Sequence, residues 1–99
     1  MDYEIYKDKI LNITDKVYFL LVNGTFGFID PPHLKFEFIS KWLEKERCLK
    51  TIKQLILQTK YIDNIPLDDV VDIVHRLLIA VTTKMQKKYP PNPWKRKVW

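Results

Sequence analysis

The sequence is poor in cysteine, glycine and alanine, and it has no long apolar segment. Cys48 is the only cysteine among 99 residues, so no disulfide can form within the chain. This excludes the small secreted domains that depend on disulfides and favours a buried structural thiol. The longest apolar run, residues 17–22, is far shorter than the ~20 residues that cross a bilayer. The acidic start of the chain lacks a signal-peptide core, which predicts a cytoplasmic protein or one packaged in a particle.

Positive charge is concentrated at one end of the chain. The net charge is +5, yet residues 84–99 contain six basic residues and no acidic one. The preceding residues hold 11 basic and 12 acidic side chains and are therefore close to neutral. This distribution predicts a single domain over residues 1–88 followed by a basic tail over residues 89–99. With 46% hydrophobic residues, the domain has enough apolar surface to build a core.

Three helices are predicted from apolar residues that recur at helical spacing. They span residues 2–14, 39–60 and 66–88. Thr14-Asp15-Lys16 is expected to end the first helix, and a loop over residues 61–65 is expected to follow the second. Carboxylates in the first turn of the last helix favour its dipole. The same helix has a wide apolar face, which predicts a central and heavily buried position.

Strands are predicted between the first two helices. Asn23-Gly24 separates two apolar runs, and this dipeptide is typical of a type I′ turn in a hairpin over residues 17–29. Residues 34–38 alternate apolar and charged side chains, which favours a third strand. A helix that starts at the Pro-Pro pair before them is the competing prediction. The expected fold class is therefore α+β, with an N-terminal helix, an antiparallel β-hairpin that a third strand extends, two longer helices and a Pro-rich basic C-terminal tail.

The predicted hairpin has two apolar faces and needs more cover than three helices supply. A second subunit would provide that cover. One face carries the candidate dimer contacts, which are Phe19, Leu21, Phe26 and Phe28. The chain is therefore expected to be a homodimer and a non-enzymatic protein-interaction module.

The basic end of the chain is the second candidate site. It mixes cations with tryptophans: Lys84, Lys87, Lys88, Trp94, Lys95, Arg96, Lys97 and Trp99. The tryptophans can anchor this segment on its own subunit or on a partner protein. Basic and aromatic side chains also suit the phosphates and bases of nucleic acid, which is the alternative function. A membrane surface is the least favoured partner.

No motif for catalysis, a metal or a cofactor is present, so no enzyme activity and no cofactor are expected. Asp68, Asp72 and His75 share one helical face and could hold a metal. Asp72 is equally placed to pair with Arg76, four residues further on, and this ordinary solvated face is the favoured interpretation. A helix-turn-helix over the last two helices is disfavoured, because aspartates lie at the end that would enter the DNA groove.

The composition has a particular character. Fourteen lysines and eleven isoleucines stand against one alanine, three arginines and two glycines, which is typical of an A/T-rich genome. The low content of glutamine and cysteine suits a protein exposed to heat. With its length and its ending Tyr-Pro-Pro-Asn-Pro-Trp-Lys-Arg-Lys-Val-Trp, the chain resembles small orphan proteins of archaeal filamentous viruses from acidic hot springs. The resemblance implies a thermostable viral accessory or virion-associated protein, often dimeric, located in the host cytoplasm or the virion. A viral or host protein is then the expected partner of its basic tail.

Overall fold

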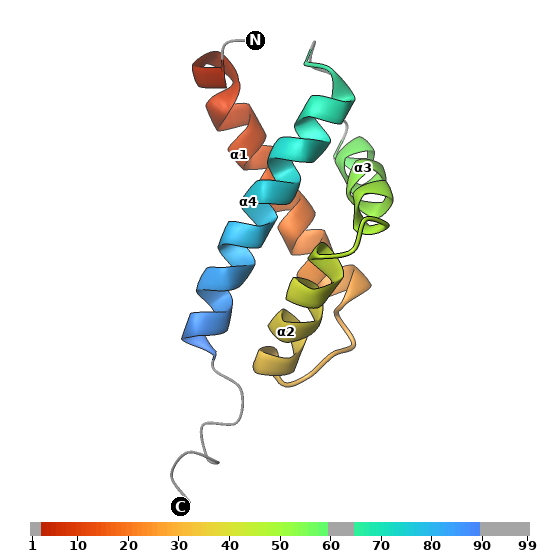
Figure 1. The fold of residues 1–99 in the computed structure, drawn as a ribbon, viewed down its shortest axis with the longest axis vertical. Coiled ribbons are helices and arrows are strands. Elements are labelled where there is room, and N and C mark those ends of the chain that lie inside the picture. Colours follow the sequence, from red (N-terminus) through yellow and green to blue (C-terminus); the bar gives the residue numbers. More distant parts are fainter. Residues whose placement is uncertain (1–2, 60–64, 90–99) are drawn as a thin grey trace, which may run out of the picture.

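The computed structural model describes residues 3–59 and 65–89, and every regular element in them is a helix (Figure 1). The elements are α1 (Tyr3–Leu20), a π-helical turn η1 (Leu21–Thr25), α2 (Pro32–Leu43), α3 (Cys48–Gln58) and α4 (Leu67–Lys88). Helix α4 contacts α1, α2 and α3, which confirms the prediction of a central last helix. The predicted α+β fold class is wrong, since the described residues form no strand.

Helix α1 is longer than predicted because its apolar stripe continues past residue 14. Ile10, Val17 and Leu21 recur at spacings that keep them on one face, and all three are fully buried. Thr14 lies on the same face, and its hydroxyl donates to the carbonyl oxygen of Ile10 at 2.7 Å. This bond to the preceding turn satisfies the hydroxyl, so a residue that was predicted to end the helix is accommodated inside it.

The predicted hairpin over residues 17–29 does not form. Its first half belongs to α1 and η1, and its second half is mainly the loop that leads to α2. A type I′ turn needs positive φ at both central residues, and Gly24 does not have it. Asn23 instead donates from Nδ2 to the carbonyl oxygen of Phe19 at 3.1 Å, one helical turn back. Glycine is required at Gly27 for another reason, since a Cβ there would overlap the carbonyl group of Asn23.

The predicted third strand, residues 34–38, lies within α2. The competing helix is the one that forms, with Pro32 in its first turn, where the missing N–H costs nothing. Phe36, Ile39 and Leu43 recur at helical spacing and are buried. The alternation that suggested a strand arises because this buried stripe runs beside a second apolar stripe on the same helix.

The predicted helix over residues 39–60 is interrupted after Leu43. Four consecutive charged residues, 44–47, separate α2 from α3, because they offer no apolar side chain to hold a helix against the core. His75 on α4 stabilises this corner, where its Nε2 donates to the carbonyl oxygen of Leu43 at 2.9 Å. The break allows α3 to bury Ile52 and Ile56 completely in the shared core.

Two further findings concern the predicted loop and membrane spans. The predicted loop over residues 61–65 lies outside the described residues except for Ile65, which is buried. Within the described ranges, no helix is long and apolar enough to cross a bilayer.

Candidate functional site

The four predicted dimer contacts do not share one face. Phe28 is 83% exposed and Phe19 is 64% exposed, whereas Phe26 is half-buried. Leu21 is fully buried in the core of its own subunit and has no surface to offer a partner. Residues 19 and 21 would point the same way in a strand, but in a helix they are about 200° apart. The change from strand to helix therefore separates them.

A stripe of apolar residues runs along the outer side of α2. Leu34, Phe38 and Trp42 lie four residues apart and therefore follow one line along the helix. Leu34 and Phe38 are both exposed, Phe38 to 53%, and Trp42 is half-buried. Phe26 covers Trp42, with ring centroids 5.4 Å apart and planes at 70°, an edge-to-face contact.

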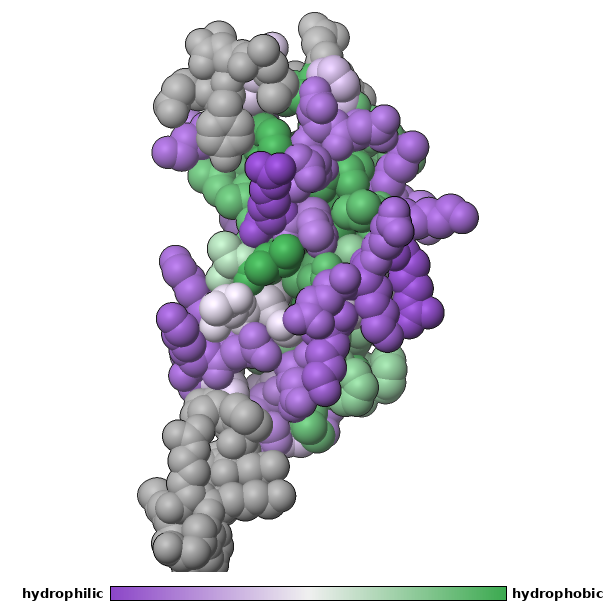
Figure 2. Space-filling model, in the orientation of Figure 1, coloured by the Kyte–Doolittle hydropathy of each residue, from purple (hydrophilic) through white to green (hydrophobic). Residues whose placement is uncertain are grey.

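The loop before α2 completes this surface. It runs back along the helix, because Phe26 contacts Trp42 near the end of α2 and Pro31 lies directly before its first residue. Phe28, which is 83% exposed, lies in this loop. Figure 2 shows hydrophobic atoms at the surface on the lower right, where the loop runs beside α2 in Figure 1. We call this surface the α2 strip; it consists of Phe26, Phe28, Leu34, Phe38 and Trp42.

Most of the α2 strip was not predicted from the sequence. Leu34 and Phe38 belong to the predicted strand over residues 34–38, and Trp42 belongs to the predicted helix over residues 39–60. The spacing of four residues from Leu34 to Trp42 is the signal that could have found them. It was hidden because Phe36 alternates with them as a strand residue would.

Phe19 lies on a different surface from the α2 strip. It borders a shallow groove of about 380 Å³ between α1 and α3, which Leu20, Lys16 and Gln58 also line. Leu57 on α3 is exposed next to Gln58. The groove is thus a second apolar surface, formed by other helices.

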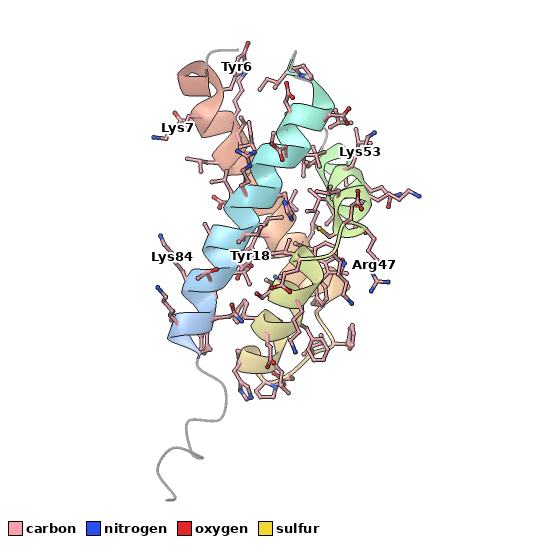
Figure 3. The ribbon with its side chains drawn as sticks, in the orientation of Figure 1. Tyr6, Lys7, Tyr18, Arg47, Lys53 and Lys84 are labelled. Carbon is pink, nitrogen blue, oxygen red and sulfur yellow. The ribbon has the colours of Figure 1, made fainter. Side chains whose placement is uncertain are left out.

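The lysines of the predicted basic site lie on the last turns of α4. Lys84, Lys87 and Lys88 are all exposed, and none forms an ion pair within the described part of the chain. The ammonium of Lys88 lies 5.6 Å from the ring centroid of Tyr89. Figure 3 shows Lys84 on the side of α4 that faces away from α2. The other members of this site lie outside the described residues: Trp94, Lys95, Arg96, Lys97 and Trp99.

Three stacked aromatic rings join the helices where α4 ends. Phe36 lies between Tyr18 and Tyr89, with ring centroids 6.5 Å and 5.8 Å away. In Figure 3 Tyr18 lies at the centre of the molecule, between α2 and α4. Its hydroxyl is buried without a hydrogen-bond partner among the described residues, and burial raises the pKa of Tyr18 to about 12. Tyr18 is therefore neutral at physiological pH and acts as a packing residue.

Two of the three side chains that could have held a metal, Asp72 and His75, have other partners. Asp72 pairs with Arg76, with Oδ2 and Nη2 3.1 Å apart, as predicted. His75 donates to the Leu43 carbonyl. No group of three metal-binding side chains occurs in residues 3–59 and 65–89.

Among the described residues, neither Cys48 nor Ser40 forms a hydrogen bond with a side-chain base, and the Cys48 thiol donates to the carbonyl oxygen of Leu43. Cys48 is fully buried, and burial raises the pKa of its thiol, so little of the reactive thiolate forms. His33 and Ser40 line one groove, but they are seven residues apart on α2, or about 10 Å along its axis. A catalytic pair needs a hydrogen bond of about 2.6–3.2 Å, so this pair does not fit nucleophilic catalysis.

Comparisons with known proteins found no similar protein. No protein-family model matches it, and neither a curated protein nor a solved structure is significantly similar to it.

Proposed function

We propose that the chain is a non-enzymatic protein-interaction module that forms a homodimer through the α2 strip. The observation that supports this most directly is the exposure of large apolar side chains on α2 and on the loop before it, where Phe28 is 83% exposed and Phe38 is 53% exposed. Contiguous exposed apolar surface is costly in water and marks interaction sites in soluble proteins. An accessory or virion-associated role remains a prediction from the composition.

A second copy of the chain is a fitting partner because the α2 strip is nearly straight. Two ridges of side chains four residues apart pack against each other at a crossing angle of about −50°. A two-fold axis would place Phe38 of each subunit near its symmetry mate, so one apolar surface covers the other. Burying Phe28 and Phe38 of both subunits contributes about 6–12 kcal/mol, which is comparable to an association cost of about 4–15 kcal/mol. A dimer at micromolar concentration needs a net binding free energy of about −8 kcal/mol, so we expect the whole α2 strip to be buried in it.

Removing the two exposed phenylalanines of the α2 strip is expected to dissociate the dimer. A Phe28→Ser/Phe38→Ser variant should raise the dissociation constant at least about tenfold, because large aromatic side chains dominate binding energies. Sedimentation equilibrium across the micromolar range measures the change, and circular dichroism verifies that the helices persist.

Phe19→Ser provides the matched control, since Phe19 is also exposed but lies on the groove between α1 and α3. This variant should dimerise like the wild type. A wild type that sediments as a monomer at micromolar concentration contradicts the proposal. If Phe19→Ser dissociated the dimer while the double variant stayed dimeric, the interface would lie on the groove between α1 and α3.

Nucleic-acid binding is the second candidate, supported by the three exposed lysines of α4 that have no ion pair within the described residues. They precede Lys95, Arg96 and Lys97 in the sequence, so up to six cations could contact phosphates. Such contacts are independent of sequence and weak, with dissociation constants of about 10⁻⁴–10⁻⁶ M at physiological salt.

The salt dependence of DNA binding tests this second candidate. Deleting residues 90–99 should weaken binding and reduce the slope of log K against log salt by about 0.7–0.9 for each phosphate that is no longer neutralised. Changing Lys84, Lys87 and Lys88 to glutamine should have a similar effect, and Lys7→Gln on α1 is the control. Unchanged affinity and slope in both variants, or no binding by the wild type, would exclude a phosphate contact.

A further inference from the structure

A groove of about 340 Å³ lies between α2 and the end of α4. It is lined by residues of both helices: His33, Glu37, Ser40, Lys41, Glu44, Gln86 and Tyr89. Tyr89 is the last described residue, and its ring stacks on Phe36 of α2. Residue 90 therefore directly follows a residue that lines this groove.

The α2 side of the groove carries an unpaired negative charge. Lys41 pairs with Glu37, with Nζ and Oε1 3.4 Å apart. Glu44, at the other end of the groove, has no ion pair among the described residues. The groove therefore favours a positively charged occupant near Glu44.

Residues 90–99 have the matching chemistry. They follow Tyr89 directly and include three basic side chains, Lys95, Arg96 and Lys97, with no acidic one. Three prolines stiffen the segment, so less conformational entropy is lost when it binds. Two tryptophans supply large apolar surfaces that a groove can cover.

The segment is also long enough to reach Glu44 within one chain. An extended polyproline chain rises about 3.1 Å per residue, so the six steps from Tyr89 to Lys95 cover about 19 Å. Tyr89 is level with Phe36 because their rings stack. From Phe36 to Glu44, α2 spans only about 12 Å along its axis.

We propose that residues 90–99 bind in the groove between α2 and α4 of their own chain, with their basic side chains toward Glu44. The own chain is favoured over a neighbour because a short connection holds the segment near the groove at an effective concentration in the millimolar range. The groove and the α2 strip lie on different sides of α2, since their residues differ in helical phase by about a third of a turn. The contact is therefore independent of the proposed dimer.

Disulfide trapping tests the contact. Ser40 lines the groove and Val98 lies in the segment, and replacing both with cysteine leaves every charge in place. The native Cys48 does not interfere, because it is fully buried and its thiol is held protonated. With oxidised glutathione, the Ser40→Cys/Val98→Cys variant should form an intrachain disulfide at a rate that does not depend on protein concentration.

A second cysteine pair, placed outside the groove, measures the rate at which the segment forms a disulfide by chance collision. Gln54 is exposed on α3 and is not part of the groove, so Gln54→Cys/Val98→Cys should close at least about tenfold more slowly. Adding Glu44→Lys to the Ser40→Cys/Val98→Cys variant should slow closure about three- to tenfold, because it reverses the attracting charge. Raising the salt concentration should slow it as well.

Three results would overturn the proposal. Equal closure rates for the Ser40 and Gln54 pairs mean that the segment has no preferred site. Disulfides between chains, formed faster at higher protein concentration, mean that the groove binds the segment of a neighbour. Amide NMR shifts provide a readout without cysteines: a chain ended after Tyr89 should differ from the full chain at residues 37–44, and identical spectra there contradict the contact.

Discussion

Replacing Leu21 with alanine is expected to lower the free energy of unfolding by about 2–5 kcal/mol. Leu21 is fully buried where α1 passes into η1, so the shorter side chain leaves a cavity beside Val17 in the shared core. A domain of this size has a total stability of only about 5–15 kcal/mol. Each kcal/mol of destabilisation should lower Tm by about 4–8 °C.

Phe19→Ala is the control for Leu21→Ala, and both should be measured by urea unfolding at one protein concentration. Phe19 is 64% exposed, so its truncation should change stability by about 0.5 kcal/mol or less. A strand would put residues 19 and 21 on one face and make their effects alike, whereas a helix puts them on opposite sides. Equal losses of stability would therefore contradict the helical assignment of this segment.

Replacing Phe36 with alanine is expected to have the largest effect, a loss of about 3–5 kcal/mol. Phe36 is buried between the rings of Tyr18 and Tyr89 and so connects α2 to α1 and α4. Aromatic pairs of this kind add about 0.5–1.5 kcal/mol beyond the buried area. Thermal unfolding followed by far-UV circular dichroism measures the loss of stability, and near-UV circular dichroism should report the loosened tyrosines.

The comparison for Phe36→Ala is Phe38→Ala, two residues along the same helix. Phe38 is exposed on the α2 strip, so its truncation should leave the stability of the monomer nearly unchanged and weaken the dimer instead. If Phe38→Ala destabilised the monomer as much as Phe36→Ala, the assignment of the two residues to opposite sides of α2 would be wrong.

The last helix could be predicted because several local signals agree. Pro66, the carboxylates of the first turn and the lysines of the last turn all favour a helix, and the predicted bounds, 66–88, nearly equal those of α4, Leu67–Lys88. Its wide apolar face also indicated that other helices would surround it, as α1, α2 and α3 do. Here propensity, capping and packing favour the same structure.

Residues 17–29 could not be predicted, because their local signals conflict with their packing. A short apolar run fits a buried strand and a buried helix equally well, and Asn-Gly favours a hairpin. The decision depends on Val17 and Leu21, which join the stripe that begins at Ile10 and bury it in the core. That gain comes from other helices, so no window of local sequence contains it.

The candidate surfaces followed from the sequence only in part. Composition alone located the lysines of α4, because exposure is the ordinary state of lysine. The exposure of Phe28 and Phe38, by contrast, depends on the direction of the loop along α2. The groove beside Glu44 depends on α2 and α4 lying next to each other.

By itself, the sequence determined the charge distribution, the absence of an internal disulfide and the position of α4, since these depend on residue identity and on local spacing. Only the tertiary structure decided that residues 17–21 and 34–38 are helical and which phenylalanines remain at the surface. The physical reason is that helix and strand differ little in local free energy for such apolar segments, while burial against α4 contributes several kcal/mol. The larger contribution, which is non-local, determines the fold.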